Sequence, residues 1–578
     1  MQENDREPII VFDNFGFQYF SQAEPTLAGI DLKIYPGEKA LIVGPSGSGK
    51  STLGHCLNGL IPFAYKGKQT GTLTIAGACS QEQTIFDRSK VVGTVLQDSD
   101  GQFVGLTVGE DIAFALENDC MATPEMHRRV EQAAAMVDMD SHLKNSPNEL
   151  SGGQKQRTAL AGVMIDDVQI LLFDEPLANL DPATGKTAIE IIDNIHRDTD
   201  KTVIIIEHRL EDVLHRPVDR VIVVDDGRIV ADMTPDELLC AGVLRAHGIR
   251  EPLYVTALKY AGVSLTPDMR PSHVESIDLT DADTKLRRWL TTVQRDTAVN
   301  QNPPVLSVED VSFSYDGKRD VLKDVSFEIR QGEMVSIVGR NGAGKTTITQ
   351  LMCGFETEHS GIIRYQGEDI APHSIRERAE YLGLVMQNPN QMISEAMIAD
   401  EVGLGLKLRG IPSEERAERV NTALRVCDLS PYRSWPIAAL SFGQKKRVTI
   451  ASMLTLNPKV LILDEPTAGQ DFRHYTEIMR FLARLNEDGL TVVLITHDMH
   501  LMLEYTPRAI VLSDGEVIAD APASEVLTDA GVIERANLKE TSLYTLTQRA
   551  HIESGTDFVQ SFIDHEKWLR SRSDDGDG

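Results

Sequence analysis

Long apolar runs are missing from this sequence. Apolar stretches such as 170–173 and 203–206 fall far short of the roughly 18 to 20 residues that a membrane-spanning helix needs. The chain is therefore not expected to cross a bilayer by itself. The first residues also lack a basic segment followed by an apolar core, so no secretory signal is visible.

Paired cysteines and an excess of basic residues are missing too. The six cysteines are scattered without a Cys-x-x-Cys pair, which is typical of a reducing compartment. We therefore expect a cytoplasmic protein and assign the thiols no chemistry. The 57 basic residues are outnumbered by 87 acidic ones, for a net charge of −30. Such a surface repels nucleic acid and anionic lipid, and it favours a basic protein partner.

What the sequence does contain is a long internal repeat. Four polar residues recur after 289 or 290 positions: Gln97 and Gln387, Ser151 and Ser441, Asp174 and Asp464, and His208 and His497. Helices and strands between these points must match in length, so the 578 residues hold a duplicated domain, each copy large enough for its own core. Lys50 and Lys345 are instead 295 apart, which predicts a five-residue insertion in the first copy near 64–70.

Each copy has a glycine-rich loop between an apolar stretch and a helix start. The loop residues are Gly44, Pro45, Ser46, Gly47, Ser48, Gly49, Lys50, Ser51 and Thr52 in the first copy, and Gly339, Arg340, Asn341, Gly342, Ala343, Gly344, Lys345, Thr346 and Thr347 in the second. Glycines let the backbone wrap a phosphate with its N–H groups inward, and the helix start adds partial positive charge. We expect Lys50 and Lys345 to reach the β- and γ-phosphates of a nucleotide, and Ser51 and Thr346 to bind Mg²⁺.

Acidic and histidine residues follow further apolar strands. Two strands end in Asp-Glu-Pro, which predicts Asp174 and Asp464 near Mg²⁺ and the next residue as the group that polarises an attacking water. An imidazole at the carboxyl end of a neighbouring strand can touch the γ-phosphate. The catalytic candidates from these patterns are Glu175, Glu465, His208 and His497.

Between loop and acidic strand lie two related octapeptides. Residues 150–157 read Leu-Ser-Gly-Gly-Gln-Lys-Gln-Arg, and residues 440–447 read Leu-Ser-Phe-Gly-Gln-Lys-Lys-Arg. They resemble the signature sequences of ABC-type ATPases, and the resemblance extends over nearly all of both copies. It implies an α/β fold of two tandem P-loop NTPase domains, each with a mainly parallel sheet core, an antiparallel β subdomain and a helical subdomain.

The resemblance also implies roles for single positions. The signature residues that would contact nucleotide are Ser151, Gly152, Gly153, Gln154, Ser441, Gly443 and Gln444, whereas Phe442 departs from the family's usual glycine. Gln97 and Gln387 match the Q-loop glutamines, with catalytic and Mg²⁺-binding roles. In the family each signature serves the phosphate loop of the opposite copy, so ATP joins the two domains. Because both copies keep the glutamate, we expect both to hydrolyse ATP.

Further positions match the family's nucleotide-binding loops. Leu180-Asp181 and Gln470-Asp471 occupy the D-loop positions. Tyr19 and Tyr315 match the aromatic residue that stacks on adenine. An alternative is that these two rings fill the core, because the surrounding residues alternate like a half-buried strand.

The segments after Gln97 and Gln387 resemble those of energy-coupling factor (ECF) importers. Strings at 207–213 and 225–232 are similar to the fused ATPases of these importers, those for hydroxymethylpyrimidine or thiamine uptake above all. This implies a coupling membrane subunit (T component), a substrate-binding membrane subunit (S component) and a peripheral place on the cytoplasmic face of the cell membrane. Acids that would accept arginines from the coupling subunit, or else complement a helix dipole, are Asp98, Glu110, Asp111, Asp400 and Glu401.

Loss of the phosphate motifs sets the expected domain boundaries. We expect a first ABC ATPase domain at 1–240, a linker at 241–303, a second domain at 304–536 and a helical tail at 537–578, in which Phe558 and Phe562 share a face that packs on the other half or stays solvated. Two alternatives remain: an ATPase of another importer, such as a sugar system, and an ABC-F-type translation factor or repair ATPase. The long basic linker of ABC-F proteins is not matched by the eight bases and seven acids of 241–300.

Overall fold

The computed structural model describes residues 7–96, 100–178, 180–280, 282–295, 300–358, 360–467 and 470–574. They form two compact units, one of Met1–Thr280 with Asp471–Arg473 and one of Asp281–Gln470 with His474–Gly578. Each unit contains one copy of the repeat.

The first unit is built on a six-stranded sheet in which five neighbouring strands are parallel and the last, β10, is antiparallel. In sheet order the strands are β10 (Arg228–Met233), β9 (Arg220–Asp225), β3 (Lys39–Val43), β8 (Thr202–Ile206), β7 (Ile170–Asp174) and β6 (Val92–Val95). Every residue of β3, β7 and β8 is buried. Strands covered on both faces require such short, continuous apolar sequences.

A four-stranded antiparallel sheet packs against this core. Its strands, in sheet order, are β2 (Leu27–Ile34), β1 (Ile10–Tyr19), β4 (Gly67–Ile75) and β5 (Ala78–Cys79). Alternate residues of β1, such as Phe15 and Phe17, join one apolar cluster with Leu53 and Leu57 of the helix that follows β3. The antiparallel sheet therefore supports that helix.

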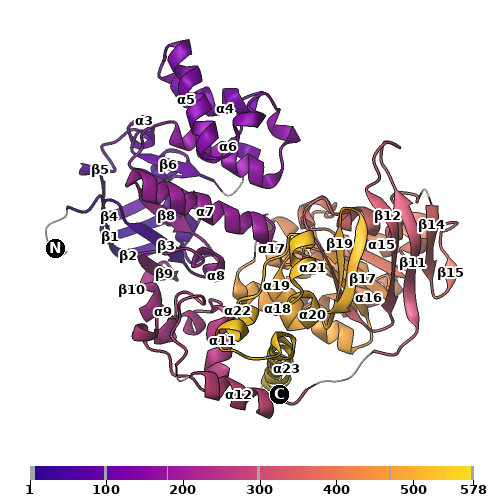
Figure 1. Cartoon of the computed structure of the whole chain (residues 1–578). Helices are drawn as coiled ribbons and strands as arrows, with labels where there is room; N and C mark the ends of the chain where they lie inside the picture. Colours follow the sequence, from indigo (N-terminus) through magenta and orange to yellow (C-terminus); the bar gives the residue numbers. More distant parts are fainter. Residues whose placement is uncertain are drawn as a thin grey trace. The chain divides into compact units, whose positions relative to one another are not determined.

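Helices complete the first unit. They are α1 (Lys50–Asn58), α2 (Leu60–Phe63), α3 (Ile85–Ser89), α4 (Val108–Asn118), α5 (Thr123–Met136), α6 (Gly152–Met164), α7 (Pro182–Thr199), α8 (Leu210–Val213), α9 (Pro235–Ala241), α10 (Val243–Ala246) and α11 (Leu253–Tyr260). Helices α4, α5 and α6 stand together as a separate helical lobe beyond the sheet, in purple in Figure 1.

The second unit repeats this architecture. Its core sheet runs β16 (Leu382–Val385), β17 (Val460–Asp464), β18 (Thr491–Ile495), β13 (Met334–Val338), β19 (Arg508–Ser513) and β20 (Glu516–Pro522). Its antiparallel sheet runs β12 (Leu322–Arg330), β11 (Pro304–Phe313), β14 (Ser360–Tyr365) and β15 (Glu368–Asp369). The fold predicted from the sequence is confirmed in both copies.

The helices of the second unit follow the same order. They are α13 (Lys345–Cys353), α14 (Ile375–Arg378), α15 (Ile398–Leu408), α16 (Ser413–Val426), α17 (Phe442–Leu454), α18 (Phe472–Glu487), α19 (Met499–Tyr505), α20 (Ala523–Val526) and α21 (Ala530–Ala536). Across the part of the chain that the structure describes, no helix is both long enough and apolar enough to span a bilayer.

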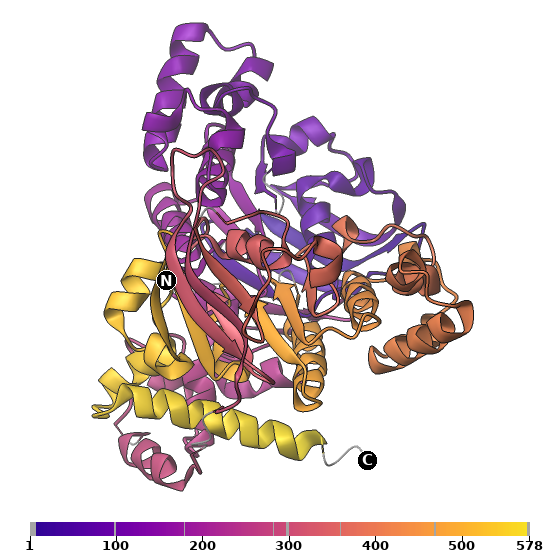
Figure 2. The ribbon, with the colours of Figure 1, turned by 90° about the vertical axis from the view of Figure 1, so that its right-hand side faces the viewer.

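The chain's last helices form a small layer in the second unit. Helix α12 (Ala282–Thr292) lies against α22 (Ser542–Arg549) and the long α23 (Gly555–Asp574), which stands out in yellow in Figure 2. The Trp289 and Phe558 ring centroids are 5.4 Å apart, and Phe558 and Phe562 are buried. The apolar face of the tail therefore packs inside the second unit, and the expectation that it stays solvated is wrong.

Candidate functional site

The strands that carry the predicted site residues are neighbours. Strand β8 pairs in parallel with both β3 and β7, and β18 pairs in parallel with both β13 and β17. Because parallel strands end at the same edge of a sheet, the loops after them meet there. Each unit thus gathers a glycine-rich loop, an Asp-Glu pair and a histidine at one edge.

The glycine-rich loops hold their lysines in the same way. The Lys50 ammonium donates to the carbonyl oxygens of Gly44 and Pro45, at 2.7 and 2.9 Å, and the Lys345 ammonium donates to those of Gly339 and Arg340 at the same distances. Burial lowers the pKa of Lys50 to about 8. A cation is therefore fixed over each loop, beside the amides at the start of α1 or α13.

The loop glycines serve two geometric needs. A Cβ added at Gly44 would lie 2.0 Å from the Val224 carbonyl oxygen, so no larger residue fits beside β9. Gly47 has φ of +76° with nothing within 4 Å of an added Cβ, so its glycine is required by the left-handed backbone. Ser48 Oγ is buried without a hydrogen-bond partner inside the loop. This cradle of amides and an unused hydroxyl fits a bound phosphate chain.

Of the aspartates at the strand ends, Asp174 is buried and Asp464 is half-buried. Burial, followed by the charge of the adjacent glutamate, raises the pKa of both Asp174 and Asp464 to about 6. Asp174 Oδ1 meets no hydrogen-bond donor among the described residues. With the hydroxyls of Ser51 and Thr346 in the first helix turns, these oxygens fit Mg²⁺, which usually takes one or two protein ligands plus phosphate and water.

The glutamates that follow are held in a strained backbone conformation. Glu175 and Glu465 have φ of 51° and 45°, which costs about 1–3 kcal/mol for residues other than glycine. In each copy the glutamate N–H donates to the last residue of the neighbouring strand. Glu175 Oε1 lies 2.6 Å from His208 Nε2, and Glu465 Oε1 lies 2.6 Å from His497 Nδ1. The structure therefore brings both predicted glutamate and histidine pairs into hydrogen-bond contact.

One buried charge beside the first glutamate was not predicted from the sequence. Glu207 is 2% exposed, and its carboxylate accepts the N–H groups of Leu177 and His208 at 3.2 and 2.6 Å. Burial raises the pKa of Glu207. The second copy has Thr496 at this position, so the difference between the two copies was the available signal.

A buried charge of opposite sign lies beside the second glutamate. Lys446, on the signature helix α17, is fully buried and donates to the Glu465 carbonyl oxygen at 2.7 Å. Burial lowers the pKa of Lys446 to about 8. In the first copy the neutral Gln156 takes this place and donates to the Pro176 carbonyl oxygen. Both signature helices are thus tied to the backbone beside the catalytic candidate.

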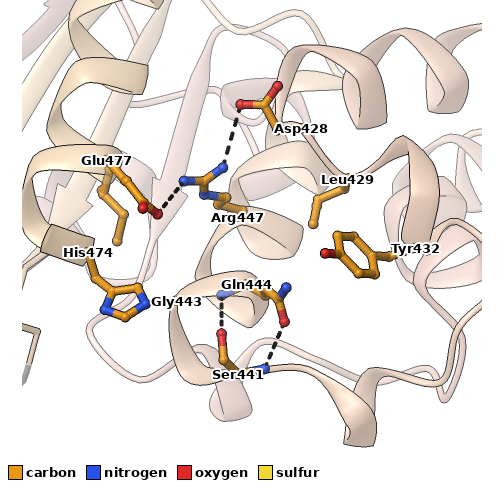
Figure 3. A pocket seen from close by; sticks show the side chains of 10 residues that line it. Asp428, Leu429, Tyr432, Ser441, Gly443, Gln444, Arg447, His474 and Glu477 are labelled. Atoms are coloured by element: carbon orange, nitrogen blue, oxygen red, sulfur yellow. Dashed lines mark hydrogen bonds and ion pairs between the residues drawn. The ribbon is translucent and has the colours of Figure 1, made fainter. Parts of the chain in front are cut away.

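The signature serines begin their helices. Ser441 Oγ accepts the Gln444 N–H at 3.2 Å, while Gln444 Oε1 accepts the Ser441 N–H at 3.0 Å, as Figure 3 shows. Ser151 and Gln154 form the same reciprocal cap. Phe442, at the position of Gly152, is 40% exposed, so its ring causes no clash inside the unit.

A pocket of about 190 Å³ opens beside the second signature (Figure 3). Arg447 crosses it, 3.5 Å from Asp428 and 3.2 Å from Glu477 of α18. Ser441 and Gly443 contribute to its wall. Arg447 of α17 thus connects Asp428, which follows α16, to α18 behind the signature.

The other predicted positions are placed as follows. Gln97 and Asp98 lie outside the described residues, and Gln387 is exposed on the bend after β16. Asp181 caps α7 by accepting the Thr184 N–H at 2.9 Å. The hydroxyl oxygens of Tyr19 and Tyr315 lie 3.1 and 3.2 Å from those of Thr52 and Thr347, respectively. Both tyrosine hydroxyl groups therefore reach the first turn of the helix that follows a glycine-rich loop.

This arrangement defines a protein with two P-loop nucleotide-hydrolase domains. The family model described as ABC transporter matches residues 27–178 and 322–468. The chain belongs to the ABC transporter ATP-binding proteins, and it is an ATPase. A second model, described as ATP-binding cassette cobalt transporter, matches residues 241–313.

Curated relatives match nearly the whole chain. A putative ABC transporter ATP-binding protein of Clostridium perfringens, CPE1583, is 54% identical over 98% of this chain and 100% of its own length. One from Enterococcus faecalis is 55% identical over the same shares. The solved structure of cbiO1 from Clostridium perfringens, described as part of the ABC transporter complex cbiONQ, is 34% identical over 43% of this chain and 98% of its own, with a TM-score of 0.38.

Proposed function

We propose that the chain is the Mg²⁺-dependent ATPase subunit of an ECF-type importer for a vitamin or other micronutrient. It would lie on the cytoplasmic face of the cell membrane, bound to a coupling subunit and a substrate-binding subunit. The main support for an ECF-type importer is the match of residues 241–313 to the family model described as ATP-binding cassette cobalt transporter. Uptake of hydroxymethylpyrimidine or thiamine is the finer proposal, and it depends on the resemblance of short strings near His208.

The site supports a division of roles among its residues. Loop amides with Lys50 or Lys345 would bind the β- and γ-phosphates. Mg²⁺, held by Ser51 and Asp174 in one copy, would supply charge neutralisation during phosphoryl transfer. In both copies the hydrogen-bonded glutamate and histidine would act on the attacking water and the γ-phosphate. The glutamate would orient the water and accept its proton. The histidine would position the glutamate and contact the γ-phosphate.

In this proposal ATP joins the two domains, with each signature facing the other domain's phosphate loop. The free amides at the start of a signature helix favour the γ-phosphate charge that disappears on hydrolysis. The serine and glutamine caps support this role because they fix the helix starts in the same geometry in both copies. Domain limits of 1–240 and 304–536, with a linker and a tail, remain part of the proposal.

The surface for the coupling subunit would lie at the starts of α4 and α15. Asp111 and Glu401 are less accessible: Asp111 is half-buried and Glu401 is buried, and each carboxylate accepts two N–H groups of the preceding loop, at 2.8 to 3.0 Å. Glu110 and Asp400 are the exposed acids of the same turns, and we assign them to basic residues of the partner. Glu110 accepts the N–H groups of Leu106 and Thr107 through one oxygen, Oε2, at 3.0 and 3.2 Å. Next to Glu110, Leu106 is 82% exposed, which suits an apolar contact.

The alternatives differ in what they would bind. Another importer class would share this surface, and only its cargo would differ. An ABC-F factor would need a long basic segment for RNA. Here the corresponding segment folds into short helices that pack on their own units: Leu253 N–H of α11 donates to Glu211, and α12 lies against α23. This packing favours the importer.

Capture of the native complex tests the proposal. The tagged chain would be expressed in cells that naturally carry it, extracted from membranes in mild detergent, and its companions identified by mass spectrometry. We expect two integral membrane proteins, one with basic cytoplasmic helices, and uptake of a vitamin or another micronutrient by the reconstituted complex. Sugar uptake would select the other importer class. Co-purifying ribosomes with RNA-stimulated ATP hydrolysis would overturn the proposal.

Charge-neutral variants locate the coupling surface. Glu110→Gln keeps the helix cap, and Asp400→Asn keeps the shape, so both should fold normally. We expect the double variant to lose membrane-subunit binding about tenfold, more at low salt than at high salt, because exposed charges are screened. Glu131→Gln, an exposed acid on α5, is the matched control. If the parent, the double variant and the Glu131→Gln control all captured the membrane subunits equally, this surface would be excluded.

A further inference from the structure

The five-residue insertion of the first copy lies beside its predicted nucleobase position. It lengthens β4, so that Gly67 pairs with Tyr19 at the end of β1. In the second copy β14 begins at Ser360, opposite Ser312, and no described strand residue lies across from Tyr315. Tyr19 is therefore inside a sheet, whereas Tyr315 extends beyond one.

The insertion also supplies an aromatic ring. The Tyr65 ring stacks on His55 of α1, with centroids 4.9 Å apart and planes at 22°. It meets the Tyr19 ring nearly edge to face, with centroids 6.2 Å apart and planes at 82°. Phe17 contacts Tyr19 at 4.9 Å. Burial lowers the pKa of His55, which favours the neutral imidazole in this stack.

The second copy holds its tyrosine by polar contacts. Phe313 contacts Tyr315 at 4.8 Å, as Phe17 contacts Tyr19. Tyr315 OH donates to Gln350, the counterpart of His55, at 2.8 Å. Tyr315 is 58% exposed, and the chain turns directly after it, where Asp316 accepts the Lys318 N–H. Among the described residues, the Tyr315 ring thus contacts one other ring, whereas the Tyr19 ring contacts two.

We propose that Tyr65 is a positioning residue for the base of the ATP bound by the first domain, and that it makes this domain more dependent on the base than the second. The inference rests on the proposed role of Tyr19 as the base-stacking ring. Tyr65, itself stacked on His55, contacts that ring, while strand β4 holds its backbone. A fixed ring loses less side-chain entropy when a base stacks on it.

The ring geometry distinguishes support from direct clamping. A base inserted between two rings needs parallel planes about 7 Å apart, twice the aromatic contact distance. Tyr19 and Tyr65 are nearly perpendicular, with centroids 6.2 Å apart, and leave no such gap. The base must therefore use a face of Tyr19 that Tyr65 does not cover. Tyr65 acts through Tyr19.

The test measures each domain by itself. In the full chain, Lys345→Ala disables the second loop and leaves the first to be titrated by calorimetry with Mg²⁺ and either ATP or inorganic tripolyphosphate, which has no base. We expect Tyr65→Ala to weaken ATP about three- to tenfold, the range of one aromatic pair, and to leave tripolyphosphate within about twofold. Tyr65→Phe, which keeps the ring, should bind ATP as the parent does.

Two controls separate this effect from general damage. Phe86→Ala removes an exposed ring of α3 in the same domain and should leave both affinities unchanged. In the Lys50→Ala chain, which reports the second domain, Tyr65→Ala should have no effect. An unchanged ATP affinity in Tyr65→Ala, or equal weakening of ATP and tripolyphosphate, overturns the inference. If the Lys345→Ala parent binds neither ligand, the proposed nucleotide site itself fails.

Discussion

Replacing the strand-end aspartate of either site by asparagine should stabilise the metal-free protein. Asp174 has a pKa of about 6 in the folded chain against an ordinary value of 3.8. Folding therefore favours the protonated form, and the ionised carboxylate at pH 7.5 lowers the free energy of unfolding by about 3 kcal/mol. An asparagine side chain at this position would not ionise. Asp174→Asn should thus gain up to about 3 kcal/mol in EDTA.

The sign of the pH dependence follows from the same values. A carboxyl group whose folded pKa is raised weakens folding above its unfolded pKa, and the effect is complete above the folded pKa. The advantage of Asp174→Asn should be about 3 kcal/mol at pH 7.5, about 2 kcal/mol at pH 5.5, and should vanish toward pH 3.8. For a domain of this size, about 3 kcal/mol raises the melting temperature by roughly 6–12 °C.

Differential scanning calorimetry in EDTA measures this effect. Each domain should give its own transition, so Asp174→Asn and Asp464→Asn, made separately, should move different transitions. Asp268→Asn, at an exposed position, should move neither. Adding Mg²⁺ and ATP should stabilise the parent more than either site variant. The reasoning is refuted if Asp174→Asn melts at or below the parent temperature in EDTA, or if its advantage grows at pH 5.5.

Three further outcomes follow from the described contacts. Glu175→Gln with Glu465→Gln should lower ATP turnover at least about 100-fold while ATP binding, followed by calorimetry, persists; undiminished turnover would contradict the assignment of the base. Arg88→Ala should destabilise the first domain by about 3 kcal/mol or more, because the fully buried Arg88 donates to the carbonyl oxygens of Cys56, Leu57 and Ser80; exposed Arg228→Ala is the thermal-melting control. Lys446→Gln introduces the residue that the first copy has at this position, so the domain should stay folded. Made in the Lys50→Ala chain, it should change the rate of ATP turnover several-fold. Identical kinetics would mean that the buried ammonium does not affect Glu465.

The sequence was sufficient for the parts of the site that local pattern determines. A short apolar strand before a glycine loop or an Asp-Glu pair specifies a buried parallel strand with those residues at its carboxyl end, and the sheet order then brings Lys50 and Asp174 to one edge. The same holds for the reciprocal cap of Ser151 and Gln154, because a capping box depends on residues three apart.

Contacts that depend on tertiary packing were not predictable in this way. Lys446 reads as one of several basic residues after a signature, and only the packing of α17 against the strand end buries it under Glu465. Tyr65 was recognisable as part of an insertion, but its stack on His55 depends on the path of the chain between α1 and β4. In the sequence, Asp111 and Glu401 were interpreted only as acids at helix starts. Their contacts with the preceding loop, whose N–H groups donate to both carboxylates, depend on how that loop folds back.

The differences between the copies fall where duplication leaves freedom. Phosphate and metal geometry tolerates little change, and both copies hold the loop lysine at the same two distances. The buried ionisable neighbours of the two glutamates differ in type, with the Glu207 carboxyl group in one copy and the Lys446 amine in the other. The two sites share their chemistry, but they differ in their buried ionisable neighbours and in the contacts that hold the tyrosine proposed to stack on the nucleobase. There is therefore no physical reason for them to hydrolyse ATP at equal rates. Measuring turnover of the Lys50→Ala and Lys345→Ala chains side by side, at equal ATP saturation, tests this directly: equal rates would show that these neighbours leave the chemical step unaffected.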